Sequence, residues 1–252
     1  MIKNKKQHDY REVHKCVQKA LNYEHNVYSA DSYGAYMWEI EKEILLKEIN
    51  LLGKTKINYL DFACGTGRIL SFVEQYVSES TGIDVSEAML VLAKSKTRNS
   101  LLINCDLTKE DVIKNKQYDL VSAFRFFLNA QKDLRNEVMP LLSKKMSNDG
   151  ILIFNIHGNI SSYYFLPMIF SRIKKNREKL NAMSYFEMLN LIKFSKLKVI
   201  RVYGIGFIPV SFYRLFKSRR KYFVSLERKF SNFKFLKYFA SNLIFVCTKE
   251  AI

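Results

Sequence analysis

The run from Ile57 to Leu70 constrains the fold more than any other stretch of this 252-residue chain. Its first half is short and mostly apolar, with Asp61 as the single charge, as expected for a central parallel strand that is covered on both faces. Gly65 and Gly67 then allow a sharp turn and let a ligand approach the backbone closely. Arg68 begins a predicted helix whose free amides and positive dipole end face the same place. The run therefore predicts an α/β sheet with a ligand site at the end of this strand.

Glycine-rich turns also bind dinucleotides, so the residues after the turn decide which kind of site is present. The dinucleotide fingerprint GxGxxG requires a third small residue. Leu70 stands three positions after Gly67, and Arg68 stands three positions after Gly65, so the pattern fails in both frames. A pyrophosphate site is therefore not predicted.

A second acidic position follows the turn at a spacing typical of nucleoside sites. Residues 81–86 form a predicted short strand, and Asp84 stands 17 residues after Gly67. An acid roughly 20 residues after such a turn accepts hydrogen bonds from a ribose diol. Helix capping is the alternative role for Asp84, but Ser86 is better placed to cap the helix predicted over residues 87–96. We therefore assign Asp84 to a ribose.

The segment from Asp61 to Gly67 resembles motif I of class I S-adenosylmethionine (SAM) dependent methyltransferases, which reads acidic-x-Ala/Gly-x-Gly-x-Gly. The resemblance covers residues 55–206 and the last predicted strand, residues 242–248. It implies an α/β fold with a Rossmann-like, seven-stranded sheet that is mostly parallel, has an antiparallel last strand and carries helices on both faces. It also implies SAM as cofactor and S-adenosyl-L-homocysteine (SAH) as product.

The same resemblance implies which residues bind the cofactor. Asp106 ends a predicted strand over residues 101–106 and matches the position that hydrogen-bonds the adenine amino group, with Leu107 lining the ring; a free loop aspartate is the alternative. At Cys64 the backbone, rather than the sulfur, is expected to face the ligand. The implied cofactor-binding residues are Asp61, Ala63, Cys64, Gly65, Thr66, Gly67, Asp84, Val85, Met89, Asp106, Leu107, Phe124 and Arg125.

Two residues are candidates for catalysis. His157 can take a proton from an alcohol or amine, because the histidine pKa is about 6.5; hydrogen bonding at a strand end is its alternative role. Arg125 can instead bind an anionic substrate group. The predicted substrate-contacting residues are Tyr28, Tyr36, Asn129, Asn159, Tyr163, Tyr164 and Arg214.

The predicted organisation is an N-terminal helical lid over residues 1–54, followed by a methyltransferase domain over residues 55–252. Apolar residues spaced by three and four predict that the lid contains a helix ending at Gly53. Insertions at about 160–182 and 207–240 lie outside the resemblance, and both are predicted to be helical caps.

Charge and cysteine content narrow the class of ligand. The net charge is +17, and residues 207–240 hold nine basic residues against one acid, Glu227. Such an excess suits nucleic acid or a membrane surface, although charge runs are usually only solvated surface. The four cysteines are far apart and form no CxxC pair, so neither a metal site nor a disulfide framework is predicted.

The predicted function is methyl transfer from SAM to a hydroxyl or amine of a small anionic acceptor, such as a phosphate, nucleotide-sugar or glycan. Residues 124–129 and 155–159 look similar to bacterial methyltransferases that accompany surface-polysaccharide (capsule) or natural-product biosynthesis. The three prolines form neither an Asn/Asp-Pro-Pro-Tyr nor a Pro-Cys motif, which argues against those nucleobase enzymes. Two alternatives stay open: an RNA methyltransferase that uses the basic insertion, and a non-catalytic SAM-binding protein that docks on a membrane or partner. A cytoplasmic location is expected, because the longest apolar runs are too short to cross a bilayer.

Overall fold

The computed structural model describes residues 10–12, 32–157, 162, 184–231, 233 and 235–250. Its centre is one seven-stranded sheet in the order β3-β2-β1-β4-β5-β7-β6. Only β7 runs antiparallel to its neighbours, β5 and β6, and the other pairs are parallel. The predicted fold class is therefore confirmed. The strands are β1 (Asn58–Phe62), β2 (Glu79–Asp84), β3 (Leu101–Asn104), β4 (Tyr118–Ala123), β5 (Met146–His157), β6 (Leu197–Ile205) and β7 (Asn242–Lys249).

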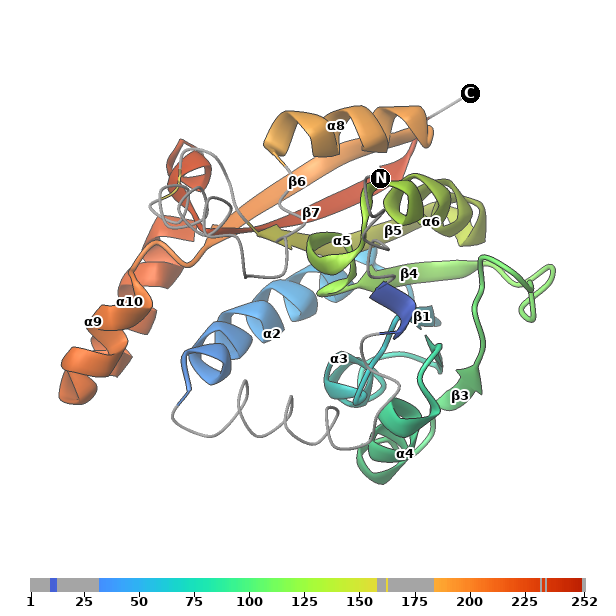
Figure 1. Cartoon of the computed structure of the whole chain (residues 1–252), viewed down its shortest axis with the longest axis horizontal. Helices are drawn as coiled ribbons and strands as arrows, with labels where there is room; N and C mark the ends of the chain where they lie inside the picture. The colour runs from blue at the N-terminus through green and yellow to red at the C-terminus, as the bar shows by residue number, and fades with distance from the viewer. Residues whose placement is uncertain are drawn as a thin grey trace, which may run out of the picture.

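Helices cover both faces of the sheet and give it two apolar cores. One core holds side chains of α6 and α8, and the other holds side chains of α2, α3 and α10; Figure 1 shows α8 and α2 on opposite sides of the strands. Among the described residues, no helix combines the length and apolar character needed to cross a membrane. The helices are η1 (Tyr10–Glu12), α2 (Tyr33–Leu52), α3 (Arg68–Val73), α4 (Glu87–Lys96), α5 (Phe126–Asn129), α6 (Lys132–Lys145), α8 (Tyr185–Phe194), α9 (Val210–Leu215), η2 (Lys217–Arg219), α10 (Arg220–Ser231) and η3 (Leu236–Phe239).

The strand order places a topological switch between β1 and β4. β1 pairs with β2 on one side and with β4 on the other, and β4 pairs with β5 on its far side. The connection after β1 therefore leads to one side of the sheet, and the connection after β4 leads to the other side. In open α/β sheets, ligands bind beyond the carboxyl ends of the strands at such a point. The carboxyl end of β1 is the predicted glycine turn.

The long helix α2 begins and ends where its sequence dictates. The Ser32 side chain caps its start by accepting a hydrogen bond from the Ala35 amide, and Gly53 ends it with a left-handed φ of 62°. Its buried face includes two fully buried carboxylates, Glu41 and Glu48. Glu48 pairs with Arg201 of β6, whereas Glu41 faces the region of the glycine turn. Helix α2 therefore contacts β6 through Glu48 and the region of the glycine turn through Glu41.

The segment between β6 and β7 folds as the short helices α9, η2, α10 and η3, and Glu227 of α10 fixes it to the sheet. Glu227 is fully buried, and its carboxylate accepts hydrogen bonds from the amides of Gly206 (2.9 Å), Phe207 (3.1 Å) and Ile208 (2.7 Å). Burial raises the pKa of this carboxyl above its usual range, while the three amides oppose that shift. The only acid of this basic segment is thus withdrawn from the surface.

Replacing Gly67 by alanine should destabilise the protein strongly. Gly67 has a φ of 74°, and a Cβ there would lie 2.8 Å from the Cβ of Ala93 on α4. Left-handed strain and overpacking together should cost about 3 kcal/mol of unfolding free energy. Gly53→Ala is the matched control, because its φ of 62° is similar but nothing lies within 4 Å of the added atom. Urea unfolding of both variants measures the difference, and equal losses would contradict the packing role.

Candidate functional site

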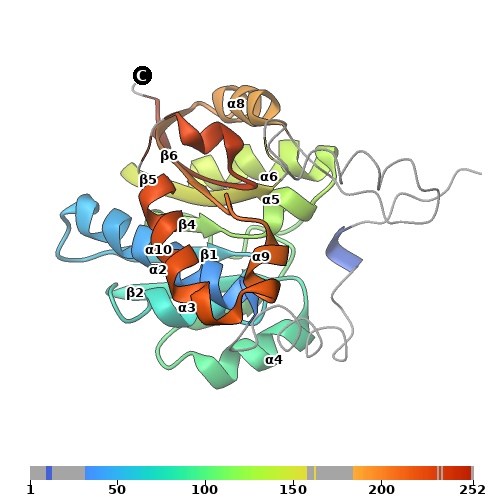
Figure 2. The same ribbon diagram turned by 90° about the vertical axis from the view of Figure 1, so that its left-hand side faces the viewer.

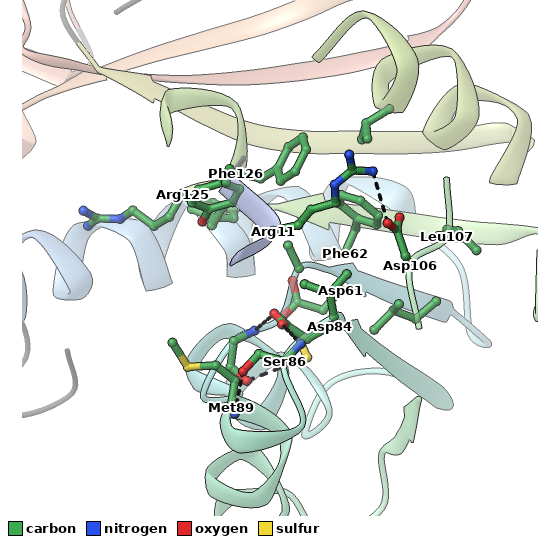
Figure 3. A pocket seen from close by; sticks show the side chains of 18 of the residues that line it. Arg11, Asp61, Phe62, Asp84, Ser86, Met89, Asp106, Leu107, Arg125 and Phe126 are labelled. Carbon is green, nitrogen blue, oxygen red and sulfur yellow. Dashed lines mark hydrogen bonds and ion pairs between the residues drawn. The ribbon is translucent and has the colours of Figure 1, made fainter. Parts of the chain in front are cut away.

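A cleft of about 1060 Å³, including its open mouth, lies at the carboxyl ends of β1, β2 and β4. Residues of the glycine turn line it, and Asp84 and Asp106 enter from the ends of the neighbouring strands (Figure 3). Every predicted cofactor residue except Gly67 lines this cleft. Gly67 lies behind it, where its missing side chain allows α3 to pack against α4.

Asp84 ties the glycine turn to the start of α4. One carboxylate oxygen accepts the Gly65 amide at 2.8 Å, and the other accepts the Ser86 amide at 2.8 Å. Burial raises the pKa of Asp84, whereas these amide bonds lower it. The helix cap is Ser86, whose hydroxyl accepts the Met89 amide at 3.3 Å. Ser86 rather than Asp84 therefore caps the helix. The amides of Gly65, Ser86 and Val85 still leave the Asp84 carboxylate with acceptor capacity for a ligand.

Asp61 presents an unsatisfied carboxylate oxygen in the cleft. One oxygen accepts the Ser122 hydroxyl at 2.5 Å, and Tyr59 completes this buried chain through its 2.6 Å hydrogen bond with Ser122. The second oxygen is buried without a hydrogen-bond partner. Burial raises the pKa of Asp61 to about 7. A buried, unpartnered carboxylate oxygen that lines a cleft favours a ligand with a cationic or donor group.

Asp106 lies at the predicted adenine end of the cleft and is paired with an arginine from the N-terminus. Arg11 donates to Asp106 Oδ2 at 3.1 Å and to Thr108 Oγ1 at 3.3 Å. Thr108 in turn donates its hydroxyl to Asp106 Oδ1 at 2.6 Å. The adjacent Tyr10 ring packs edge-on against Phe126, with centroids 5.9 Å apart. The short helix η1 therefore forms one wall of the cleft.

The Arg125 side chain is directed toward α2 and away from Asp61, Asp84 and Asp106 (Figure 3). Its Nη2 lies 3.6 Å from Glu41 Oε1, and Arg68 Nη1 lies 3.1 Å from Glu41 Oε2. The Arg125 backbone has a φ of 65°, and its amide donates to the buried Asn155 side chain at 2.6 Å. About a fifth of the Arg125 side chain, 21%, stays exposed at the cleft. The buried Glu41 thus holds two arginines of the cleft wall in place.

The remaining predicted residues have different locations. Asn129 lines the cleft, whereas Tyr36 accepts a hydrogen bond from Arg220 and Arg214 is exposed on α9. The backbone of His157 ends β5 opposite Asn242 of β7. Four predicted substrate residues lie outside the described part of the chain: Tyr28, Asn159, Tyr163 and Tyr164.

Several residues of the cleft were not predicted from the sequence. Tyr10, Arg11 and Thr108 line it, and Glu41 supports its arginines. Glu41 carries a detectable signal, because it falls on the apolar face of α2. Over the described residues, no group of three histidine, cysteine, aspartate or glutamate side chains is arranged to hold a metal ion.

Comparisons with known proteins agree with this geometry. A family model described as a methyltransferase domain matches residues 60–152, which include the glycine turn, Asp84 and Asp106. The chain is 27% identical over 153 residues to a malonyl-[acyl-carrier protein] O-methyltransferase of Acetivibrio thermocellus, covering 58% of this chain and 52% of that protein. It is 34% identical over 114 residues to the putative methyltransferase YqeM of Bacillus subtilis, covering 43% and 45%. The chain spans about half the length of the curated relatives it matches.

Solved structures extend the similarity to nearly the whole chain. Magnesium protoporphyrin IX methyltransferase from Synechocystis, solved with bound SAH, superposes with a TM-score of 0.64 at 11% identity, covering 92% of this chain and 94% of that one. At this identity the similarity establishes the fold. The chain therefore has the Rossmann-like fold seen in class I SAM-dependent methyltransferases, and its residues 60–152 match the model of a methyltransferase domain.

Proposed function

We propose that the protein is a SAM-dependent methyltransferase that acts on a small anionic acceptor. The observation that carries this proposal is the meeting of Asp61, Asp84 and Asp106, from the ends of three adjacent parallel strands, around one glycine turn. The similarity to methyltransferases in both sequence and fold supports the same reaction.

The residues of the cleft fit SAM. Asp84 keeps acceptor capacity for a ribose hydroxyl, and the unpartnered Asp61 oxygen suits the ammonium group of the methionyl part. A Cβ at Gly65 would meet nothing within 4 Å, so the turn is open to a ligand. Leu107 and Met89 supply apolar surface for an adenine ring. When bound, SAM supplies a methyl group on a positively charged sulfur.

The work of the protein in such a reaction is mainly alignment and exclusion of water. Asp61 would hold the methionyl end of the cofactor and Asp84 its ribose, both from the rigid ends of neighbouring strands. In this proposal His157 takes a proton from an acceptor hydroxyl or amine, and Arg125, held by Glu41, binds an anionic part of the acceptor.

Two relatives support an anionic acceptor. Both are named malonyl-[acyl-carrier protein] O-methyltransferases, and a malonyl group carries a free carboxylate. For this chain, the choice of a phosphate, nucleotide-sugar or glycan acceptor stays a prediction, as do a role in surface-polysaccharide or natural-product biosynthesis and a cytoplasmic location. Incubation with methyl-labelled SAM and a panel of nucleotide-sugars, sugar phosphates, malonyl thioesters and matched neutral sugars and acyl thioesters tests the acceptor class. Label on neutral acceptors alone would contradict the proposal.

The His157→Ala variant tests the catalytic base. Removing a general base should lower kcat about 100-fold, while the affinity for SAH should be unchanged. Turnover with the best acceptor of the panel measures the first effect, and calorimetry with SAH measures the second. Unchanged turnover with intact cofactor binding would remove the assignment.

A further inference from the structure

An aromatic and aliphatic patch is exposed on the segment formed by α9, η2 and the start of α10. Phe212 and Phe216 have ring centroids 6.1 Å apart, and both pack against Phe223 at 6.5 and 6.4 Å. The Tyr222 ring extends the group, 6.3 Å from Phe223. Between them Leu215 is 76% exposed. We call this group the α9–α10 patch; its exposed members are Phe212, Leu215, Phe216 and Tyr222.

The segment that carries the α9–α10 patch is rich in cations, and Glu43, an acid of α2 that contacts α10, is paired with Arg228. Residues 210–222 contain five lysines and arginines and neither aspartate nor glutamate. Arg219 and Lys221 are exposed, whereas Arg220 is turned inward to the Tyr213 carbonyl and Tyr36. The nearest acid along the chain, Glu227, is fully buried under the three amides that it binds. The surface is therefore both apolar and positively charged.

Further exposed aromatic and basic residues follow the α9–α10 patch in the chain. Phe235 is 84% exposed and Phe239 is also exposed, and Lys229 is exposed near the end of α10. Figure 1 shows α9 and α10 as an arm that projects from the body beside α2, and Figure 2 shows this arm across the face turned to the viewer. The arm is rigidly based, because Tyr213 and Phe223 are buried against the body.

From this arrangement we propose that the α9–α10 patch docks the protein on an anionic lipid bilayer. Interfacial helices bind such surfaces by inserting aromatic and leucine side chains while lysines and arginines meet the headgroups. A single RNA strand would need a basic groove with aligned rings, whereas these side chains lie on a projecting arm. A leucine that is three-quarters exposed also gives RNA nothing to stack on. This docking does not depend on the proposed methyl transfer.

Vesicle co-sedimentation of the full chain tests the proposal. Binding is expected to vesicles that contain phosphatidylglycerol and to be much weaker with pure phosphatidylcholine. Leu215→Ser should weaken binding about tenfold through lost apolar burial. Arg219→Gln with Lys221→Gln should weaken it about 25-fold, at roughly fivefold for each cation near the surface.

Matched controls separate this surface from general charge and apolarity. Phe194→Ser changes a side chain that is 73% exposed on α8, and Lys94→Gln with Lys144→Gln removes two exposed cations from α4 and α6. Both should bind vesicles as the wild type does, and far-ultraviolet circular dichroism should show all variants folded. The proposal would be overturned by the absence of binding to anionic vesicles, by equal loss in the controls, or by a dimer in sedimentation velocity that Leu215→Ser abolishes. Tight binding of a labelled RNA oligonucleotide that is lost in Leu215→Ser would assign the patch to nucleic acid instead.

Discussion

The Asp84→Asn variant should bind SAH about 100-fold more weakly than the wild type. The carboxylate would lose its charge toward the ribose hydroxyls, and hydrogen bonds to charged groups contribute about 1.5 to 3 kcal/mol each. The amide would also place a donor against the Gly65 or Ser86 amide, which now donate to Asp84 at 2.8 Å. Isothermal titration calorimetry measures the affinity.

Asp119→Asn is the matched control for this experiment. Asp119 also anchors backbone, because its carboxylate accepts hydrogen bonds from the Asn58 amide at 3.0 Å and from Lys54 at 2.6 Å. However, it lies near the start of β4, whereas the cleft lies at the carboxyl ends of the strands. Its loss should lower stability without changing the affinity for SAH. If the Asp84 variant binds SAH as the wild type does, the ribose assignment is wrong.

Asp61 should make cofactor binding depend on pH. Its pKa is raised to about 7 by burial, and the ammonium of SAH pairs with the ionised form. The affinity should therefore fall about tenfold for each pH unit below 7 and stay level above it. Calorimetry in buffers of different ionisation heat should show proton release on binding near pH 6. Asp61→Asn should abolish this dependence and weaken binding at pH 8 by 10-fold to 100-fold, about 1.5 to 3 kcal/mol.

The same variant should stabilise the ligand-free protein. The folded pKa lies above the unfolded value of about 3.9, so the folded protein holds this proton more tightly and stability falls as pH rises from about 4 to about 7. Ionised Asp61 costs about 4 kcal/mol at pH 8, and Asp61→Asn should recover part of it as a higher melting temperature. Ser122→Ala removes a bond that lowers this pKa, so it should move the binding midpoint above 7. A melting temperature that falls in Asp61→Asn at pH 8 would contradict the assignment.

The sequence was sufficient to predict the sheet and to predict that the glycine turn, Asp84 and Asp106 meet at one cleft. These features depend on local patterns: a buried run before the glycine turn, an acid at a fixed spacing after it, and Ser86 in position to cap α4. The carboxyl ends of neighbouring parallel strands lie side by side, so acids that follow successive strands come close together. Their proximity can therefore be predicted without knowing any long-range contact. Every predicted cofactor residue but Gly67 accordingly lines the cleft.

The support of the site depends on long-range packing that local patterns do not encode. Arg11 reaches Asp106 across 95 positions of sequence, and nothing near Arg11 indicates that contact. Glu41 is different, because it falls on the buried face of α2 with Met37 and Ile44. A charge on an apolar helix face needs a buried partner, so that position could have been marked, although its partners could not. Glu227 is a similar case. The sequence shows it only as the one acid of a basic segment, whereas in the structure its carboxylate binds the backbone amides that follow β6.

Isothermal titration of the folded wild-type chain with SAH tests the central claim most directly. The cleft at the ends of β1, β2 and β4 predicts saturable heat with a stoichiometry of one ligand per chain, together with a higher melting temperature in the presence of ligand. The account would be contradicted if protein that is folded by circular dichroism gave no heat with SAH and no change in melting temperature.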